Sequence, residues 1–532
     1  MPPSTIPAWH ISQSAYERWI EDVETPFFQG LDTGSGPLIS IVLATFNTHH
    51  PWLRQALDSV LSQRYQQWQL CICDDASTDP GVVDIIEEYR RRDPRIVLCK
   101  RNENGGISAA TNSAMQLADG QYLAFMDHDD CLPEHALACV VNFLESKPQV
   151  RLLYSDSDHL DEQGQRCRPF FKPAFNYDLL LAQNYFNHLT LIAAGLVREL
   201  GGLRPELDGS QDYDLVLRAI ERLDDSQVAH LPQVLYHWRE APTSVSRTDI
   251  ASAARAARTA VQKHLERREI NATVQPARGA LIYNQVNWPM CQAPPRMLVI
   301  VGADSEKSSA AAAELQRRTR FENACFIGWN AQEHPPTEFL AAQLMGWSPT
   351  GNELVCILPP AVSPAAPDWA CSLAAMAARA DCGCLEAAIR DQASQNILNP
   401  PQVEAPPNST AVGSLARYWG PEKGYFASMA LSREVASVAG GVLVFKMKLW
   451  QQIQDGVDAQ SGHEDLYLAL SLASRRAGLR NLWTPSVEFT APGSAVASPL
   501  LSVASRSETR GGDLNYHPAL AYCRAIEGES QD

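Results

Sequence analysis

The stretch Leu38-Ile-Ser-Ile-Val-Leu-Ala-Thr-Phe-Asn47 decides the fold of the first half of the chain. Its first six residues are almost all apolar, and several are β-branched, which predicts a short strand buried on both faces. A loop follows at 44–47, and residues 52–63 then carry apolar side chains at helical spacing. Together these features predict a β-loop-α unit.

The same pattern recurs along the first half of the chain. We predict further strands at 68–73, 96–99 and 121–126, and helices at 82–92 and 107–117. Strands that alternate with helices indicate a parallel sheet of the α/β class. Because ligands bind beyond the carboxyl ends of such strands, the loops 45–47, 74–79 and 127–130 should open on one edge of the sheet.

The overall composition limits the classes of function. The chain has 532 residues, of which 45% are hydrophobic and 20% charged, and its mean hydropathy is -0.22. These values indicate a globular protein with two domains as the starting expectation. The formal net charge of -17 disfavours a nucleic-acid-binding surface, which needs clustered Lys and Arg. An acidic protein that binds a nucleotide needs local positive charge, and a divalent cation is its simplest source.

Cysteine spacing and hydropathy bear on the compartment. The close cysteine pairs among the 13 cysteines are spaced C-x-C rather than C-x2-C as in a zinc site, and we expect most of the cysteines to be buried thiols of a reducing compartment. Residues 1–20 lack the charged start and apolar run of a secretory signal. No window reaches the ~18 apolar residues of a membrane-spanning helix. The expected location is the cytoplasm, with any membrane contact peripheral.

The acid cluster Asp127-His128-Asp129-Asp130 directly follows a predicted strand. Three carboxylates so close together repel one another unless a positive charge lies among them. Magnesium or manganese prefers a few carboxylates together with phosphate oxygens of a substrate, which suits a nucleotide diphosphate site. A solvated acidic turn is the alternative, and the motif alone does not separate the two.

Two later stretches also carry residue types used in catalysis. Asp212 and Asp214 begin an amphipathic helix, where a carboxylate either stabilises the helix dipole or acts as a general base. His237 and Arg239, which flank Trp238, could bind a metal and a phosphate. A histidine beside a tryptophan is also commonly structural.

Seven stretches occur in a fixed order: Ser40-Ile-Val-Leu-Ala-Thr-Phe-Asn47, Ser59-Val-Leu-Ser-Gln63, Asp74-Asp-Ala-Ser-Thr-Asp79, Asn104-Gly-Gly106, Asp127-His-Asp-Asp130, Gly209-Ser-Gln-Asp-Tyr-Asp214 and Leu235-Tyr-His-Trp-Arg239. Their order and spacing resemble the family 2 glycosyltransferases, inverting enzymes of the GT-A fold, and specifically the bacterial polysaccharide and O-antigen type. The resemblance extends from Pro37 to Ser246.

The resemblance implies a role for each matching residue. The implied donor-binding residues are Thr45, Phe46, Asn47, Asp75, Gly105, Gly106, Asp127, Asp129, Asp130 and Arg239. Thr45, Phe46 and Asp75 match the pocket for the nucleotide base. Asp127 would contact the ribose, Asp129 the metal, and Asp130 the donor sugar.

The implied reaction is a single displacement that inverts the anomeric centre. By the resemblance Asp212 is the catalytic base, and His237 is a second metal ligand in the closed complex. The family often has Glu where this chain has Gln211, which leaves residue 211 without an implied role. Manganese or magnesium would neutralise the departing nucleoside diphosphate.

The implied partners are a nucleotide-sugar donor and a saccharide or lipid-linked saccharide acceptor, in the synthesis of a cell-surface polysaccharide such as O-antigen. A lipid-linked acceptor implies peripheral association with the cytoplasmic face of the inner membrane. A homo-oligomer is a further expectation.

The second half of the chain resembles a weaker copy of the first. A Pro-rich stretch at 292–295 separates them, which predicts a lead-in at 1–36, a GT-A domain at 37–290 and a degenerate GT-A-like domain at 296–532. The stretches 437–445, 462–468 and 476–485 resemble the later part of a family 2 domain, with Glu464 and Asp465 at the position of the base. The tail 513–518 also resembles the end of these proteins.

Donor chemistry is the part that the second half lacks. After the predicted strand 354–358 the chain reads Pro359-Pro-Ala-Val-Ser363, without a carboxylate where the metal would bind, and after the strand 297–301 it reads Gly302-Ala-Asp304. We therefore favour a copy that has lost donor chemistry over a second, metal-independent transferase. A Pro-rich insertion at 399–407 is predicted to be a surface loop.

Two other classes of function are weighed against the transferase. A nucleotidyl- or phosphoryl-transferring enzyme would share the carboxylates, the metal and the parallel sheet, but the chain lacks G-x4-G-K-[ST] and a glycine-rich loop after the first strand. A non-catalytic carbohydrate-binding or scaffold protein would not need the intact acid cluster and Asp212.

Overall fold

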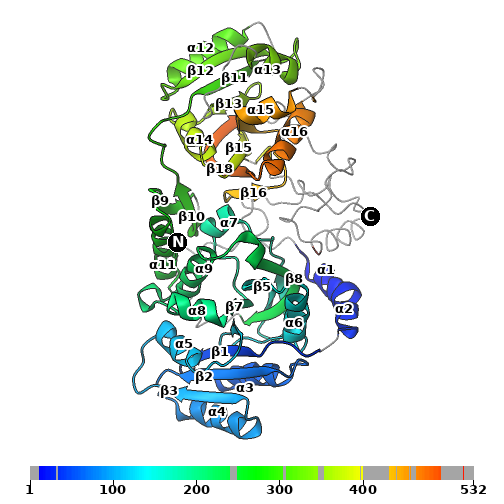
Figure 1. The fold of residues 1–532 in the computed structure, drawn as a ribbon, viewed down its shortest axis with the longest axis vertical. Coiled ribbons are helices and arrows are strands. Elements are labelled where there is room, and N and C mark those ends of the chain that lie inside the picture. Colours follow the sequence, from blue (N-terminus) through cyan, green and yellow to red (C-terminus); the bar gives the residue numbers. More distant parts are fainter. Residues whose placement is uncertain are drawn as a thin grey trace. The chain divides into compact units, whose positions relative to one another are not determined.

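The computed structural model divides the chain into two compact units (Figure 1). The structure describes residues 11–31, 34–239, 249–278, 280–303, 307–344, 353–395, 397–399, 430–438, 440–454, 456, 463–492 and 519. Of these residues, the N-terminal unit contains 11–175, 183–270 and 519, and the C-terminal unit contains 176–182 and 271–492. The domain limits at 290 and 296 stay a prediction, and by packing residues 271–290 belong with the C-terminal unit.

The N-terminal unit is built on one mixed sheet in the order β3-β2-β1-β4-β7-β5-β6, with β8 beside β5. Its strands are β1 (Ile39–Thr45), β2 (Trp68–Asp74), β3 (Ile96–Lys100), β4 (Tyr122–Phe125), β5 (Leu152–Leu160), β6 (Arg166–Phe170), β7 (Thr190–Ala193) and β8 (Val228–Arg239). The four strands predicted from periodicity, β1 to β4, are confirmed, and they pair in parallel.

In the other half of this sheet, β7 and β6 run opposite to the remaining strands. β7 lies between β4 and β5 and is antiparallel to both, while β8 runs parallel to β5. The order β2-β1-β4 therefore places the loops after β2, β1 and β4 side by side at the carboxyl ends of the strands.

Helices cover the N-terminal sheet (Figure 1). They are α1 (Gln13–Trp19), the π-helical turn η1 (Ile20–Glu24), α2 (Thr25–Gln29), α3 (His50–Leu61), α4 (Pro80–Arg92), α5 (Ile107–Met115), α6 (Ala136–Ser146), α8 (Ala194–Leu200), the 3-10 turn η2 (Pro205–Leu207), α9 (Gln211–Ile220), the 3-10 turn η3 (Asp225–Gln227) and α11 (Ile250–Arg267). α1 to α2 form within the stretch that the sequence predicted only as a lead-in.

The local sequence explains where α4 begins and ends. The Asp79 side chain accepts a hydrogen bond from the Gly81 amide at 2.9 Å, and Pro80 occupies the first turn, where its missing N–H costs nothing. Three arginines, 90–92, fill the last turn and complement the negative end of the helix dipole.

The C-terminal unit repeats this topology. Its sheet has the order β12-β11-β13-β17-β15-β18-β14, with β16 beside β18, and a separate two-stranded sheet joins β9 and β10. The strands are β9 (Thr273–Ala277), β10 (Ala280–Asn287), β11 (Met297–Ala303), β12 (Ala324–Asn330), β13 (Leu354–Leu358), β14 (Ser363–Pro364), β15 (Cys382–Asp391), β16 (Arg433–Val435), β17 (Val442–Lys446) and β18 (Arg480–Ala491). The helices are α7 (Tyr177–Ala182), α12 (Ser308–Arg318), α13 (Pro336–Leu344), α14 (Trp369–Ala377), α15 (Met447–Ile453) and α16 (His463–Arg476).

Strand directions match between the two sheets. β12, β11 and β13 are parallel neighbours as β2, β1 and β4 are, and β17 is antiparallel to both of its neighbours as β7 is. β18 runs parallel to β15, as β8 does to β5. The predicted fold class, an α/β architecture in two tandem copies, is confirmed.

Apolar side chains that point alternately to the two faces of each strand form the hydrophobic cores of both units. Ile39, Ile41 and Leu43 of β1 pack in one cluster with Leu53 and Leu57 of α3. In β11, the odd-numbered residues 297–301 face one cluster and the even-numbered residues 298 and 300 face another, so both faces of that sheet are buried. Within the described part of the chain, no helix combines the length and the apolar character needed to span a bilayer.

Candidate active site

Asn47 ties together two of the loops at the carboxyl edge of the N-terminal sheet. Its side-chain oxygen accepts hydrogen bonds from the backbone amides of Thr78 and Asp79, at 2.8 and 3.2 Å. Its own backbone amide donates to the Ser77 hydroxyl at 2.9 Å. The φ angle of Asn47 is 48°, a left-handed conformation that Asn tolerates. The predicted convergence of the loops after β1 and β2 is thus observed.

Asp75 is buried and anchors the loop before α5. Its carboxylate accepts hydrogen bonds from the Gly105 amide at 3.0 Å and the Gly106 amide at 2.9 Å. The Arg101 guanidinium lies 2.7 Å from the same carboxylate. The structure therefore brings three predicted donor-binding residues together, with the amides of Gly105 and Gly106 directed at Asp75.

Thr45 and Phe46 end β1 on the same edge. The hydroxyl of Thr45 is buried and lies 2.6 Å from the hydroxyl of Thr48. Phe46 is 43% exposed although it is a large apolar side chain. An exposed aromatic ring beside a ligand edge is suited to stacking on a planar base.

β8 holds the acid cluster in place. Residue Cys131 and residue His237 exchange backbone hydrogen bonds of 3.1 and 2.9 Å. The Asp127 amide donates to the Tyr236 hydroxyl at 3.0 Å, and that hydroxyl donates to Asp130 at 2.6 Å. Hydrogen bonds thus hold the loop after β4 against the end of β8, although the two segments are about a hundred residues apart in the chain.

Asp130 is the fully buried member of the cluster. Besides the Tyr236 hydroxyl, it accepts the backbone amide of Arg239 at 2.7 Å. Burial raises the pKa of Asp130 well above its ordinary value, and the neighbouring charges of Asp127 and Asp129 raise it further. Since both of its oxygens have protein partners, Asp130 is suited to shaping the loop rather than to facing a donor sugar.

Arg239 also has protein partners. Its guanidinium donates to the backbone oxygen of Asp129 at 2.8 Å and to the side chain of Gln55 at 2.6 Å, and it lies 5.8 Å from the ring centre of Trp52. The expected pairing of Arg239 with a phosphate therefore competes with bonds that already hold the acid cluster.

Asp127 and Asp129 are the partly exposed carboxylates of the cluster. Their side chains are 43% and 20% exposed, respectively. Partial burial raises the pKa of Asp127 to about 6, and the charge of Asp129 adds to the rise. His128 lies near Asp129, with 3.7 Å between its Nδ1 and a carboxylate oxygen. The pair thus holds negative charge that the protein only partly balances.

Asp212 approaches this pair from the first turn of α9. The side-chain amide of Asn184 donates to Asp212 Oδ2 at 3.0 Å. Burial raises the pKa of Asp212, while the nearby His188 lowers it and the charge of Asp127 raises it. The interaction between Asp127 and Asp212 indicates that the candidate base and the acid cluster share one site.

His188 links the two carboxylate groups. Its Nε2 lies 3.8 Å from Asp127 Oδ2, and its ring stacks on Tyr236 with centroids 4.7 Å apart. Burial lowers the pKa of His188 to about 4, although the charges of Asp212 and Asp129 oppose this shift. His188 and Asn184 were not predicted from the sequence, because neither lies in a recognisable motif.

A buried network fixes the orientation of His237. Its Nδ1 lies 2.5 Å from Asp158 of β5, which also accepts from the Tyr16 hydroxyl at 2.6 Å and from Arg166 at 2.5 Å. Arg166 pairs in turn with Glu24. Burial alone would raise the pKa of Asp158, but His237 and Arg166 hold it at about 2. With Nδ1 engaged, Nε2 is the nitrogen left for a ligand.

The donor set at this edge fits a divalent cation. Among the described residues, no group of three or more His, Cys, Asp or Glu side chains is arranged to hold a metal by itself. Magnesium and manganese sites at nucleotides need only one or two carboxylates, because phosphate oxygens complete the coordination shell. Asp129, whose side chain is 20% exposed, supplies such a carboxylate.

The corresponding edge of the C-terminal unit has a different chemistry. β13 occupies the place of β4 in the strand order, and Pro359 and Pro360 follow it. Asp465 lies in the first turn of α16, while the side chain of Glu464 lies outside the described residues, as does the tail 513–518. The described part of this edge therefore carries no counterpart of Asp127 and Asp129.

Comparison with known proteins relates part of the chain to a family. The family model described as Glycosyl transferase family 2 matches residues 40–201. The chain is 32% identical over 483 residues to "Uncharacterized protein y4gI" of Sinorhizobium fredii, with 86% of this chain and 53% of that protein covered. It is 36% identical over 267 residues to "O-antigen biosynthesis protein RfbC" of Myxococcus xanthus, with 50% and 20% covered.

A third relative is covered more fully. The Bacillus subtilis protein EpsE, which is named as a glycosyltransferase, is 30% identical over 210 residues, with 39% of this chain and 74% of EpsE covered. The chain spans about half of the Sinorhizobium relative and a fifth of the Myxococcus relative.

Proposed function

This chain belongs to glycosyltransferase family 2, and we propose that its N-terminal unit transfers a sugar from a nucleotide-sugar donor to a saccharide or lipid-linked saccharide acceptor. The product would be part of a cell-surface polysaccharide such as O-antigen. The name of the Myxococcus relative supports this choice of pathway class.

One observation carries the proposal. The segment of Asn184 and His188 joins Asp212 to the acid cluster at the carboxyl edge of the N-terminal sheet, because Asn184 lies 3.0 Å from Asp212 and His188 lies 3.8 Å from Asp127. Such an edge is where α/β sheets bind ligands. The unbalanced charge of these carboxylates would be unfavourable without a cationic ligand, and this supports a site for a metal and a diphosphate.

Asp212 is the proposed general base. Its carboxylate would take the proton of an acceptor hydroxyl, and the hydroxyl oxygen would attack the anomeric carbon of the donor. The bond from that carbon to the diphosphate oxygen breaks, and its electron pair leaves with the nucleoside diphosphate, so the anomeric centre inverts. Asn184 holds Oδ2 of Asp212 at 3.0 Å and thereby orients the carboxylate for this role.

Asp129 is the proposed metal ligand, Asp127 the ribose contact and His237 a second ligand through Nε2. When bound, Mg²⁺ or Mn²⁺ would neutralise the charge that develops on the departing diphosphate. Arg239 and Asp130 would act by holding the acid cluster in shape, since their side chains are already engaged there.

The base of the nucleotide would lie at the loops after β1 and β2. Phe46 supplies an exposed ring, and Asp75, whose carboxylate already accepts from the Gly105 and Gly106 amides, would hold the loop beside that ring in shape. Thr45, Asn47, Gly105 and Gly106 would form the walls of this pocket through backbone and hydroxyl groups.

The C-terminal unit is proposed as a copy of the fold without donor chemistry. The Pro359-Pro360 sequence after β13 supports this assignment. A lipid-linked acceptor would bring the chain to the cytoplasmic face of the inner membrane as a peripheral protein, and self-association is a further proposal.

A panel assay tests the function. The full chain would be incubated with nucleotide sugars of several bases, an acceptor extract and manganese, and release of nucleoside diphosphate would be measured with and without EDTA. We expect release with one class of donor and loss of release with EDTA. If no donor is turned over and none shifts the melting temperature, the alternative of a non-catalytic carbohydrate-binding or scaffold protein is favoured.

A further inference from the structure

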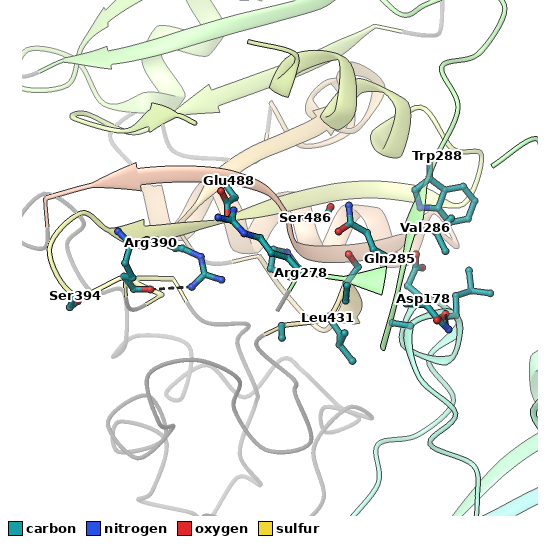
Figure 2. A pocket seen from close by; sticks show the side chains of 18 residues that line it. Asp178, Arg278, Gln285, Val286, Trp288, Arg390, Ser394, Leu431, Ser486 and Glu488 are labelled. Atoms are coloured by element: carbon teal, nitrogen blue, oxygen red, sulfur yellow. Dashed lines mark hydrogen bonds and ion pairs between the residues drawn. The ribbon is translucent and has the colours of Figure 1, made fainter. Parts of the chain in front are cut away.

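The C-terminal unit contains a cavity of about 410 Å³ that the proposed transfer reaction does not use. It is lined by residues of α7, of β9 and β10, of β15 and the loop after it, of 430–432 and of β18. Figure 2 shows Arg390 and Ser394 at one end of the cavity and Trp288 at the other. Its size is in the range of small-molecule sites.

A buried acceptor without a partner lines the cavity. Asn284 is only 3% exposed, and its side-chain nitrogen donates to the backbone oxygen of Leu181 at 3.3 Å. Among the described residues, none donates a hydrogen bond to its buried side-chain oxygen. Leaving such an oxygen unpaired is unfavourable, so the position calls for a ligand or water that donates a hydrogen bond.

The charges of the lining balance one another. It holds two arginines, Arg278 and Arg390, and two carboxylates, Asp178 and Glu488, which gives a formal sum of zero. Arg278 pairs with Glu488, and Asp178 pairs with Arg379 at 2.5 Å. Arg390 is then the lining charge for which the described residues show no carboxylate partner, and a nucleoside diphosphate or another polyanion needs more positive charge than this single guanidinium offers.

The polar groups of the lining both donate and accept hydrogen bonds. Arg390 donates to the Gln395 backbone oxygen at 3.0 Å and retains further N–H groups. Gln285 adds an amide, and Ser432 and Ser486 add hydroxyls. Trp288 adds a flat apolar surface, and the Arg379 guanidinium lies 4.0 Å from its ring centre. A ligand that matches this set has many hydroxyls, a weakly polar face and no net charge.

We propose that this cavity is a saccharide-binding site, which holds a short, uncharged segment of the acceptor glycan. Sugar hydroxyls donate and accept side by side, so one hydroxyl can donate to the Asn284 oxygen and accept from Arg390 or Gln285. The C–H face of a sugar ring packs on an aromatic surface such as Trp288. The identification of the glycan as the acceptor rests on the proposed transferase function, whereas the binding of a saccharide does not.

Saturation-transfer NMR tests the site on the full chain. The probes are neutral hexose and 6-deoxyhexose trisaccharides, with a hexuronate trisaccharide and UDP as further arms. We expect a neutral trisaccharide to bind, and we expect Asn284→Ala and Arg390→Ala each to weaken binding about tenfold. Arg317→Ala, a change at an exposed arginine of α12 outside the lining, should leave binding unchanged.

The variants keep the test decisive. Asn284→Asp retains an acceptor oxygen and should keep more affinity than Asn284→Ala, while Arg390→Ala changes a side chain at the rim if Asn284→Ala does not fold. Binding of UDP rather than sugars to these residues would overturn the proposal, as would saccharide binding that neither variant weakens. If the wild-type chain binds saccharides but turns over no donor, the transferase proposal fails and this site stands.

Discussion

The two units of this protein have the same sheet but differ at the edge where a ligand would bind. Strand order and strand direction agree from β2-β1-β4-β7-β5-β8 to β12-β11-β13-β17-β15-β18. In the N-terminal unit, the strand β4 leads into three carboxylates. β8 holds this segment through the bridge between Cys131 and His237 and through the hydrogen bond from Tyr236 to Asp130. In the C-terminal unit, β13 leads into Pro359 and Pro360. Packing therefore preserves the fold in both units, whereas the chemistry depends on a few residues at the strand ends.

Two carboxylates, one from each unit, show the same contrast. Glu386 of β15 is 1% exposed, and it accepts hydrogen bonds from the amides of Gly440 and Gly441 and from the Asn399 side chain. Asp127 has no comparable set of donors, and its pKa is raised to about 6. A carboxylate that the protein satisfies is structural, and one that it leaves unbalanced marks a place for a ligand.

The largest effect is expected from removing the proposed base. Asp212→Asn should reduce the rate of sugar transfer by about 10²- to 10⁴-fold, because the amide cannot take the acceptor proton. Asp465→Asn, the matching change in the C-terminal unit, should leave the rate within about twofold, as should Asp84→Asn on the exposed face of α4. The measurement is the initial rate with the donor identified in the panel.

Equal losses of transfer rate in Asp465→Asn and Asp212→Asn would contradict the proposed difference between the two units. A loss in Asp465→Asn as large as that in Asp212→Asn would mean that the C-terminal unit has kept a base in use.

A smaller effect is expected from the residue that orients His237. Asp158→Asn removes the charge that His237 Nδ1 contacts at 2.5 Å, and we expect the manganese concentration for half-maximal rate to rise about 10- to 100-fold. Asp381→Asn in the C-terminal unit breaks a comparable pair with Arg379, 2.8 Å apart, and should leave the manganese requirement unchanged.

Melting temperatures of both variants separate positioning from stability. Both should melt lower than the wild type, and only Asp158→Asn should change the response to manganese. An unchanged manganese requirement in Asp158→Asn would remove His237 from the proposed metal site.

The smallest effect concerns acid stability. The pKa of Asp158 in the fold is about 2, below its ordinary 3.8, so its ionised form stabilises the fold above pH 3.8 and this contribution is lost as the pH falls toward 2. The gap in melting temperature between wild type and Asp158→Asn should therefore be a few degrees near pH 6 and shrink toward pH 2.

Asp381 gives the matched case in the other unit. Burial opposes the shift, but Arg379 lowers the pKa of Asp381, whose side chain is 40% exposed. Water screens that pair, so the gap for Asp381→Asn should be smaller at every pH. A larger gap for Asp381→Asn would contradict this ranking of the two ion pairs.

The sequence predicted the parallel half of the N-terminal sheet because apolar periodicity encodes buried strands directly. The convergence of the loops at Asn47, at Asp75 and at Asp127 followed from the rule for parallel strands. The insertion of β7 between β4 and β5 could not be predicted, since pairing order is decided by tertiary packing.

The motifs of the candidate site could be predicted from the sequence, but the residues that hold those motifs in place could not. Asp158 lies in a strand that is buried despite four consecutive polar residues, 155–158, and its partner Tyr16 is 142 residues away. His188 and Asn184 lie in a segment without periodicity. Arg239 was predicted to bind phosphate, but its partners Gln55 and Asp129 are visible only in the fold.

The number of donor molecules bound per chain tests whether the N-terminal unit alone binds the donor. Isothermal titration of the full chain with the identified nucleotide sugar in manganese should give one site per chain, and Asp129→Ala should abolish it. Two sites per chain, or one site whose affinity is unchanged in Asp129→Ala, would contradict the assignment of donor binding to the N-terminal unit alone.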